Sequence, residues 1–494
     1  MVRIAFHYLG CRLNEAENEA IARSMTDKGH EIVAIADNPD VIVLNTCGVT
    51  ADAMRKSRNL MRRFAAAGAR LLVLMGCAVD LMQAGENPVS DDDLRQGAKR
   101  DDSDHSVDQR FEQKADRESE LGTRQSFDRG SAIGVDIGSE SSFVQRVEED
   151  TEHSSAQDDD LRIVRIYRDD RPKAADIIVR AIDETWNASA AQAPTAYKPR
   201  IRCFIKIEDG CNNACTYCSV RLARGRERSV AGADIVEEIR RCLALGEREI
   251  VLTGVQLGAW KEGDRRLPDL IGDILSKTDV ERLRLSSIEP WHLRPELYEL
   301  WSDKRLCPHF HTPVQSGSDA VLSMMRRRTH LAEFESKIND LRRKIPNVRV
   351  STDLIVGFPG ETDAMWGETL DFIERIGFDD IHLFRFSARP GTIAASLPNP
   401  VAPEIKRERW NEAHERMMQI KRDKMQASIG ALCRVLWETR GHEIVDGKRR
   451  WSGYAENYLR LFRYFDADRS MRGTMTCEIF GENDVATNIE QDDI

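Results

Sequence analysis

Three cysteines within eight residues, Cys211, Cys215 and Cys218, constrain this chain more than any other feature. Their C-x3-C-x2-C spacing puts three thiolates in one loop, which can hold three irons of a cubane cluster and leave the fourth iron open. An open iron can chelate S-adenosylmethionine and pass it the electron that releases a 5′-deoxyadenosyl radical. Zinc is the alternative, but zinc normally takes a fourth ligand nearby, and no Cys or His follows closely. The spacing therefore predicts an iron–sulfur cluster with three catalytic cysteines.

The compartment decides how the other cysteines are interpreted. The N-terminal residues show no positive region followed by an apolar one, and no stretch of about 20 apolar residues exists. We therefore expect a cytoplasmic protein with neither a signal peptide nor a membrane span. Cytosolic chains rarely use disulfides, so scattered cysteines are expected as small buried hydrophobes. Five are of this kind: Cys203, Cys242, Cys307, Cys433 and Cys477.

The distribution of charge matters more than the formal net charge of −11. Residues 80–160 hold 23 Asp and Glu but only 9 Lys and Arg, so the rest of the chain is mildly basic. The negative net charge thus comes from a single acidic segment. The remaining residues have a mildly basic balance, which is compatible with a nucleic-acid partner. Few large apolar residues occur in this segment, so it cannot offset its ordering entropy. We predict an acidic disordered insertion at about 83–160.

Hydrophobic patterning predicts an α/β chain with three folded parts. Residues 1–187 are expected to form a parallel α/β domain that carries the insertion. Residues 199–400 alternate strands and helices regularly, which predicts a partial (βα) barrel with its chemistry at the C-terminal strand ends. A helical linker at 401–427 and a small β module at 428–494 should follow, and 188–199 reads as a linker.

The individual elements are predicted from apolar runs and helical periodicity. Strands are expected at 4–9, 41–45, 71–75, 161–167, 203–208, 249–253, 282–286, 348–355 and 380–387. Helices are expected at 15–28, 173–186, 231–245, 295–302, 319–325, 331–343, 365–376 and 403–427.

Three further cysteines, Cys11, Cys47 and Cys77, each lie just past a predicted strand of the first domain. The carboxyl ends of parallel strands share one edge of a sheet, so these thiols are expected to converge. Two interpretations remain open from spacing alone, a second cluster site or three buried structural cysteines.

Motifs spread along the chain resemble those of the methylthiotransferases of the radical S-adenosylmethionine superfamily. That family joins a three-cysteine N-terminal domain, a radical barrel and a β-barrel-like TRAM domain. The resemblance implies two [4Fe-4S] clusters, S-adenosylmethionine as cofactor, a tRNA substrate, a flavodoxin- or ferredoxin-type electron donor and a sulfur source. The segments that carry it are 10–14, 45–50, 76–78, 210–218, 252–256, 286–290, 313–318, 353–362 and 387–392.

The same resemblance implies which residues contact the cofactor. Glycines let backbone approach a ligand, and carboxylates suit its ammonium and hydroxyl groups. The alternative for each position is an ordinary residue of a barrel loop that does not contact the cofactor. The S-adenosylmethionine pocket would be lined by Tyr217, Gly254, Glu289, Gln315, Ser351 and Asp353.

Basic residues in two places suggest contacts with RNA, since cations meet phosphates and aromatic rings stack on bases. One group follows the cysteine loop, and the other lies in the β module, where a β core with solvated edges is the alternative. The residues are Arg224, Arg226 and Arg228, then Lys448, Arg449, Arg450, Tyr458 and Arg460.

The substrate is suggested by resemblance within the family. Segments 10–14, 49–53, 55–57 and 210–213 are most similar to enzymes that act on N6-threonylcarbamoyladenosine at position 37 of tRNA. The branches that modify isopentenyladenosine or an aspartate of a ribosomal protein are alternatives. A non-catalytic iron–sulfur protein that binds RNA is the alternative from another class.

Overall fold

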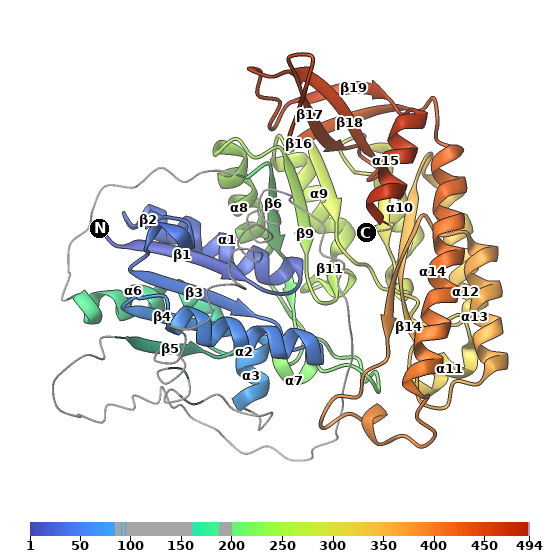
Figure 1. Ribbon diagram of the computed structural model, residues 1–494, viewed down its shortest axis with the longest axis horizontal. Coiled ribbons are helices and arrows are strands. Elements are labelled where there is room, and N and C mark those ends of the chain that lie inside the picture. The colour runs from blue at the N-terminus through green and yellow to red at the C-terminus, as the bar shows by residue number, and fades with distance from the viewer. Residues whose placement is uncertain (84–89, 91–93, 95–160, 187–199, 493–494) are drawn as a thin grey trace.

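The computed structural model describes residues 1–83, 90, 94, 161–186 and 200–492, which form the three parts coloured blue to red in Figure 1. Nearly all of the predicted acidic insertion, and the whole of the predicted linker at 188–199, lies outside these residues. The predicted α/β class is confirmed, because the first two parts are built on parallel sheets. None of the helices in the described ranges combines the length and apolar character that a membrane span requires.

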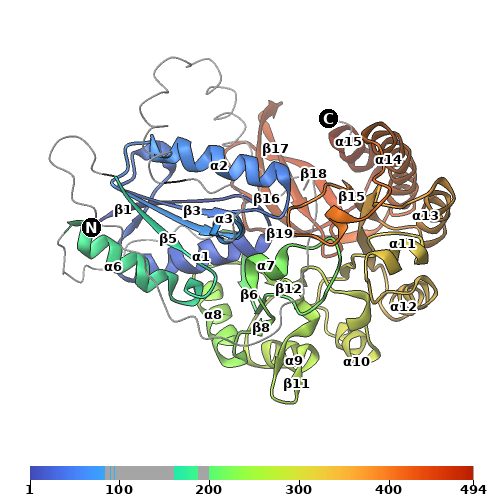
Figure 2. The same cartoon turned by 90° about the horizontal axis from the view of Figure 1, so that it is seen from below.

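The N-terminal domain is a five-stranded parallel sheet in the order β2-β1-β3-β4-β5, with helices on both faces (Figure 2). Its central strands β3 and β4 are buried along their whole length, which explains their continuous apolar sequences. The strands are β1 (Arg3–Tyr8), β2 (Glu31–Ile32), β3 (Val41–Thr46), β4 (Leu71–Gly76) and β5 (Arg162–Ile166). The helices are α1 (Arg12–Asp27), α2 (Ala51–Ala65), α3 (Cys77–Gln83) and α6 (Ala174–Trp186).

The central domain is a partial barrel of two three-stranded parallel sheets, which meet through the bridges Leu283–Leu306 and Ser287–His311. The predicted strands are confirmed, and a further strand, β13, was missed because its three residues form no apolar run. The main strands are β6 (Arg202–Lys206), β9 (Glu249–Thr253), β12 (Arg282–Leu285), β13 (His309–His311), β14 (Arg349–Val356) and β15 (Asp380–Arg385). Two short hairpins accompany them, β7 (Glu208–Asp209) with β8 (Arg228–Ser229) and β10 (Lys261–Glu262) with β11 (Arg265–Arg266).

Helices cover the outer face of the barrel, and alternation along each strand sends its other side chains inward. On β14, Val350 and Leu354 join the core under the helices, so Ser351 and Asp353 face inward. The helices are α7 (Val220–Arg224), α8 (Gly232–Ala244), α9 (Leu267–Lys277), α10 (Pro295–Tyr298), α11 (Asp319–Met324), α12 (Leu331–Lys344), α13 (Asp363–Ile376) and α14 (Pro403–Gln426). Helices α7 and α9 were not predicted.

The C-terminal module is an antiparallel sheet in the order β18-β17-β16-β19, as the sequence suggested, followed by an unpredicted helix. It lies against the N-terminal ends of the barrel strands. There Arg284 donates to the carbonyl oxygen of Glu456 at 2.7 Å, and Arg282 donates to that of Tyr454 at 3.2 Å. The elements are β16 (Leu432–Val445), β17 (Lys448–Tyr454), β18 (Arg460–Asp466), β19 (Met475–Ile479) and α15 (Glu482–Asp492).

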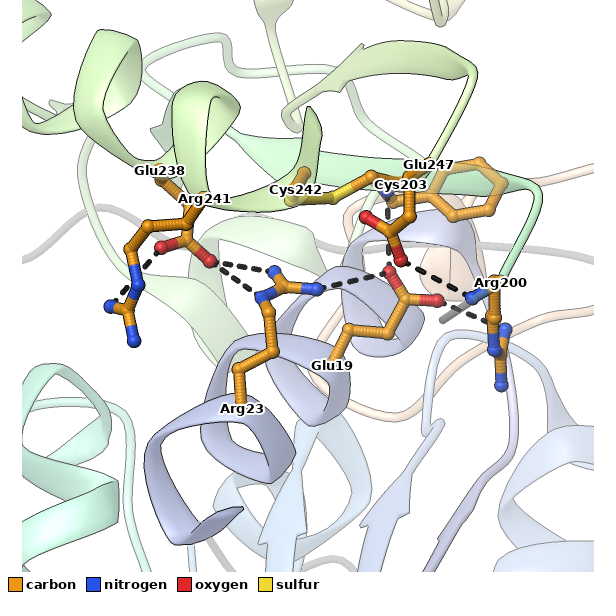
Figure 3. Close-up of a disulfide and its surroundings, with 9 residues drawn as sticks. Glu19, Arg23, Arg200, Cys203, Glu238, Arg241, Cys242 and Glu247 are labelled. Atoms are coloured by element: carbon orange, nitrogen blue, oxygen red, sulfur yellow. Dashed lines mark hydrogen bonds and ion pairs between the residues drawn. A yellow bond between two sulfur atoms is a disulfide. The ribbon is translucent and has the colours of Figure 1, made fainter. Parts of the chain in front are cut away.

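Charged side chains join the N-terminal domain to the barrel, as Figure 3 shows. Arg23 of α1 is buried and bonds to Glu238 of α8 at 2.7 Å. Arg200, which precedes β6, bonds to Glu19 of α1 at 3.0 Å. These pairs fix α1 across the first strand of the barrel.

Two cysteine predictions are corrected. Cys203 and Cys242 are buried, as expected, but they form a disulfide, because β6 and α8 pack directly and bring their Cα atoms to 6.5 Å (Figure 3). Cys477 is exposed, because it lies on the edge strand β19. Cys307 and Cys433 are buried, as expected.

A candidate active site with two cysteine triplets

The first triplet, Cys211, Cys215 and Cys218, lies in the loop that connects the β7 strand to helix α7, beyond the C-terminal end of β6. Gly210 opens the loop with a φ of +83°, and a Cβ there would lie 2.1 Å from the carbonyl oxygen of Arg226. Only glycine fits this conformation. The amide of Cys211 donates to the carbonyl oxygen of Gly225 at 3.0 Å, which closes the loop.

The electrostatics of this loop suit a bound cation. Burial, followed by the charge of Cys215, raises the pKa of Cys211 to about 12. Burial and the charges of the other two cysteines raise the pKa of Cys218. Thiols that hold each other protonated become thiolates when a metal supplies positive charge. The donor set therefore fits the predicted iron–sulfur cluster.

A buried ion pair stands beside this triplet. Arg327 bonds to Glu289 at 2.6 Å and donates to the carbonyl oxygen of Pro313 at 2.8 Å. Its Nη1 lies 3.9 Å from the sulfur of Cys215. Glu289, predicted as a cofactor contact, is thus next to the cysteines. The role of Arg327 could not be predicted from the sequence, because a run of three arginines does not show which one turns inward.

The second triplet assembles at the carboxyl edge of the N-terminal sheet, as predicted. Cys11 precedes α1, Cys47 follows β3, and Cys77 begins α3 directly after β4. The three strands β1, β3 and β4 are neighbours in the sheet. A Cβ on Gly10 would lie 2.7 Å from the Cβ of Cys47, so these two loops are in contact. Burial, and then the charges of Cys77 and Cys11, raise the pKa of Cys47 to about 12. This set fits a second cluster for the same reason as the first.

Arg224 joins the two triplets. It ends α7, six positions after Cys218, and its Nε lies 3.2 Å from the sulfur of Cys77. Its Nη1 donates to Glu17 and to Asp209, each at 3.0 Å. The Arg224 guanidinium therefore contacts a sulfur of the second triplet. Its helix, α7, directly follows the loop that holds the first triplet.

Arg224 is therefore not an RNA contact, which corrects one prediction. The residue is 2% exposed, and its remaining amine donates to Asn14 at 2.6 Å. Burial opposes its charge, but the charges of Cys77, Glu17 and Asp209 raise its pKa well above the ordinary value. The sequence analysis missed Glu17, Asp209 and Asn14, because their role depends on contact between two domains.

Other predicted cofactor residues lie around the loop and along the barrel. Tyr217 is buried against Cys215 in an apolar cluster. A Cβ on Gly254 would lie 3.1 Å from the Oε2 atom of Glu208, so little space separates them. Gln315 has a φ of +78° and pairs with β14. These three positions remain predicted contacts.

Glu208, which the sequence analysis missed, is a buried carboxyl at the same end of the barrel. It accepts a hydrogen bond from the amide of Gln256 at 2.7 Å. Burial raises its pKa to about 8. The residue stands three positions before Cys211, so its place next to a cysteine motif was the signal available in the sequence.

Ser351 and Asp353 bond to histidines of neighbouring strands on the inner face. His311 approaches Ser351 at 2.9 Å through Nδ1 and Asp353 at 3.1 Å through Nε2. His382 contacts the same carboxylate oxygen at 3.1 Å through Nδ1. This polar group occupies the middle of the barrel wall.

The other residues predicted to contact RNA differ in their exposure and contacts. Arg226, Arg228 and Lys448 are exposed. Tyr458 instead packs edge-on against His309, with 4.5 Å between ring centroids, and Arg460 is buried and donates to Ser452 at 3.2 Å. The predictions for Tyr458 and Arg460 are therefore corrected, because the module uses both side chains in its own packing and in its contact with the barrel.

Arg449 and Arg450 are partly exposed on β17. Arg449 donates to the carbonyl oxygen of Gly441 at 3.1 Å. The guanidinium carbon of Arg450 lies 4.6 Å from the ring centroid of Phe462. Both side chains thus have contacts within the module and keep part of their surface open.

Comparisons with known proteins agree with this geometry. Residues 205–373 match the model of the radical SAM superfamily, and residues 3–90 match that of the uncharacterized protein family UPF0004. The fold also resembles the radical S-adenosylmethionine methyltransferase TsrM of Kitasatospora setae, with a TM-score of 0.51 at 12% identity over 85% of this chain and 89% of that one. The fold and the cysteine loop define a radical S-adenosylmethionine enzyme.

Curated relatives narrow the class. The threonylcarbamoyladenosine tRNA methylthiotransferase MtaB of Bacillus subtilis is 28% identical over 93% of this chain and 90% of its own length. The tRNA-2-methylthio-N(6)-dimethylallyladenosine synthase of Desulfosudis oleivorans is 31% identical over 92% of this chain and 84% of its own. This chain belongs to the radical S-adenosylmethionine methylthiotransferase family.

Proposed function

We propose that this enzyme adds a methylthio group to C2 of N6-threonylcarbamoyladenosine at position 37 of tRNA. The observation that carries the proposal is the pair of cysteine triplets, because a transfer of sulfur through radical chemistry needs two separate iron–sulfur sites. Arg224 connects the two sites through direct contact with Cys77. The substrate is supported by the named activity of the Bacillus subtilis relative and of a Thermotoga maritima MtaB that is 39% identical over 54% of this chain.

The two triplets have different tasks in this proposal. Cys211, Cys215 and Cys218 would hold the cluster that binds S-adenosylmethionine, and Cys11, Cys47 and Cys77 would hold the second. When bound, these clusters supply the electron for cofactor cleavage and the site at which sulfur is held for methylation.

The protein residues set the surroundings of both sites. Arg327 and Arg224 each place a guanidinium beside one cysteine sulfur, where it favours the thiolate. Carboxylates hold each guanidinium in position: Glu289 for Arg327, and Glu17 with Asp209 for Arg224. Exposed Arg226, Arg228 and Lys448 would meet tRNA phosphates, with Arg449 and Arg450 beside them. An electron donor of the flavodoxin or ferredoxin type, a sulfur source and a cytoplasmic location complete the proposal.

The alternative substrate is dimethylallyladenosine, which the name of the 31% identical relative favours. Nucleoside mass spectrometry of tRNA separates the two. We expect cells without the gene to lose 2-methylthio-N6-threonylcarbamoyladenosine and to accumulate its precursor. Complementation with the wild-type gene should restore the product, and the Cys47→Ala variant should not. Loss of the dimethylallyl derivative instead would assign the enzyme to the other substrate, and no change in either would refute a tRNA substrate.

A further inference from the structure

Arg12 is a cation that faces the inner wall of the barrel from the N-terminal domain. It follows Cys11 and begins helix α1, which packs across β6. Its guanidinium carbon lies 5.7 Å from the ring centroid of Tyr458, a residue of the C-terminal module. Burial and then the charges of Arg284, His311 and Arg12 lower the pKa of His309 on β13. The Arg12 side chain thus stands where all three parts of the molecule meet.

Other arginines in this region form ion pairs with carboxylates. Arg202 and Arg284 bond to Glu249 at 3.1 and 3.0 Å. Arg12 has no hydrogen bond or ion pair within the part of the chain that the structure describes. A partly buried guanidinium without a carboxylate is costly unless a ligand supplies the negative charge.

The nearby carboxylates already have partners. Asp353 contacts His311 and His382, both at 3.1 Å. Asp380 bonds to Lys421 of α14 at 2.9 Å. Among the described residues, these carboxylates bond to other partners and leave the Arg12 guanidinium without an ion pair.

We propose that Arg12 binds the α-carboxylate of the threonine moiety on N6 of the substrate base, and so selects this base over one with an apolar N6 group. The proposal rests on the function proposed above. Arg12 directly follows Cys11 in the chain, so its guanidinium belongs to the same loop as the second triplet, at which C2 of the base would be thiolated. Of the two candidate bases, only the threonylcarbamoyl one carries an anion. A guanidinium holds a carboxylate through two parallel hydrogen bonds, which an apolar dimethylallyl group cannot accept.

His382 and Asp353 complete the site. Half of the His382 side chain is exposed, and the ring stacks on His311 with 4.9 Å between centroids. The charge of Arg12 acts on His382, and His382 bonds to Asp353. This pair suits the hydroxyl and amide groups of the threonylcarbamoyl chain. Arg12 is thus a specificity-determining residue, and these two are its polar surroundings.

The test measures binding of two anticodon stem-loop RNAs to the reconstituted full-length enzyme by fluorescence anisotropy. One RNA carries N6-threonylcarbamoyladenosine, and the other carries its methyl ester, which is larger by one methyl group and has the same phosphates but no carboxylate charge. Wild type should prefer the acid by about tenfold, the effect of one charge-assisted contact. Arg12→Gln should bind both RNAs equally, and Arg12→Lys should keep part of the preference.

The control variant is Arg62→Gln, which removes an exposed arginine of α2 in the same domain and should behave like wild type. Iron content is compared for all variants, so that damage at Cys11 is recognised. An acid preference that survives in Arg12→Gln would overturn the proposal, as would equal binding of both RNAs by wild type. An equal loss for both RNAs in Arg12→Gln would assign Arg12 to phosphate instead. If wild type thiolates only dimethylallyl RNA, the proposed substrate itself is wrong.

Discussion

The two cysteine triplets reach similar surroundings by opposite routes. Cys211, Cys215 and Cys218 occupy one loop of one domain, and their guanidinium neighbour Arg327 belongs to the same domain. Cys11, Cys47 and Cys77 come from three strand ends, and their guanidinium neighbour Arg224 belongs to the other domain. The first site therefore depends on a local loop, whereas the second depends on how two domains dock. This comparison can be tested by substitutions that disturb either the local loop of the first site or the docking of the two domains at the second site.

The largest effect is expected for Arg224→Met. It leaves Glu17 and Asp209 buried without their main partner, which costs about 3–5 kcal/mol of unfolding free energy. Lys206 also bonds to Glu17, at 3.0 Å, so the lower end of this range is expected. Urea unfolding measures the stability, and iron analysis after reconstitution should show loss of about one cluster. Wild-type stability with full iron would show that the second site does not depend on docking.

Glycine substitutions compare the loops themselves. Gly10 and Gly210 each precede the first cysteine of a triplet, with φ of +121° and +83°. Alanine costs about 1–3 kcal/mol from backbone strain at either position. Gly210→Ala should be worse, because its Cβ meets backbone, whereas that of Gly10 meets the Cys47 side chain. Iron analysis should show each variant losing iron at its own triplet. Equal loss at both sites in one variant would contradict the separation.

Arg327→Met should act on the first triplet alone. It removes the partner of Glu289, a carboxylate with 15% of its side chain exposed, so about 1–3 kcal/mol is expected. Cofactor cleavage should fall while iron at the second triplet is kept. Retained cleavage with normal kinetics would show that this arginine is only structural.

The smallest effect is expected for Glu238→Gln, a control for docking without contact to sulfur. It weakens the interface pair with Arg23 (Figure 3) by about 1 kcal/mol, because Glu238 is partly exposed. Both clusters should load fully. Loss of the second cluster in this variant would mean that docking strength, rather than Arg224, supports the N-terminal site.

The same difference explains what the sequence could predict. The triplet of Cys211, Cys215 and Cys218 could be predicted as a cluster site because its three cysteines lie within one short stretch of the sequence. Cys47 and Cys77 could be placed together because each follows an apolar strand. Arg224 was assigned to RNA because alternating arginines do not reveal which one turns inward, and Tyr458 was assigned to RNA because its contact with His309 joins residues far apart in the chain. Contacts between domains were the part that local patterns could not supply.

The most direct test removes one triplet at a time and measures iron, 5′-deoxyadenosine and thiolated RNA in the same samples. With Cys11, Cys47 and Cys77 changed to alanine, the account predicts about half of the iron, continued formation of 5′-deoxyadenosine and no thiolated RNA. With Cys211, Cys215 and Cys218 changed, it predicts about half of the iron and neither product. Full iron or thiolated RNA from the first variant would contradict the claim that this enzyme works with two separate clusters.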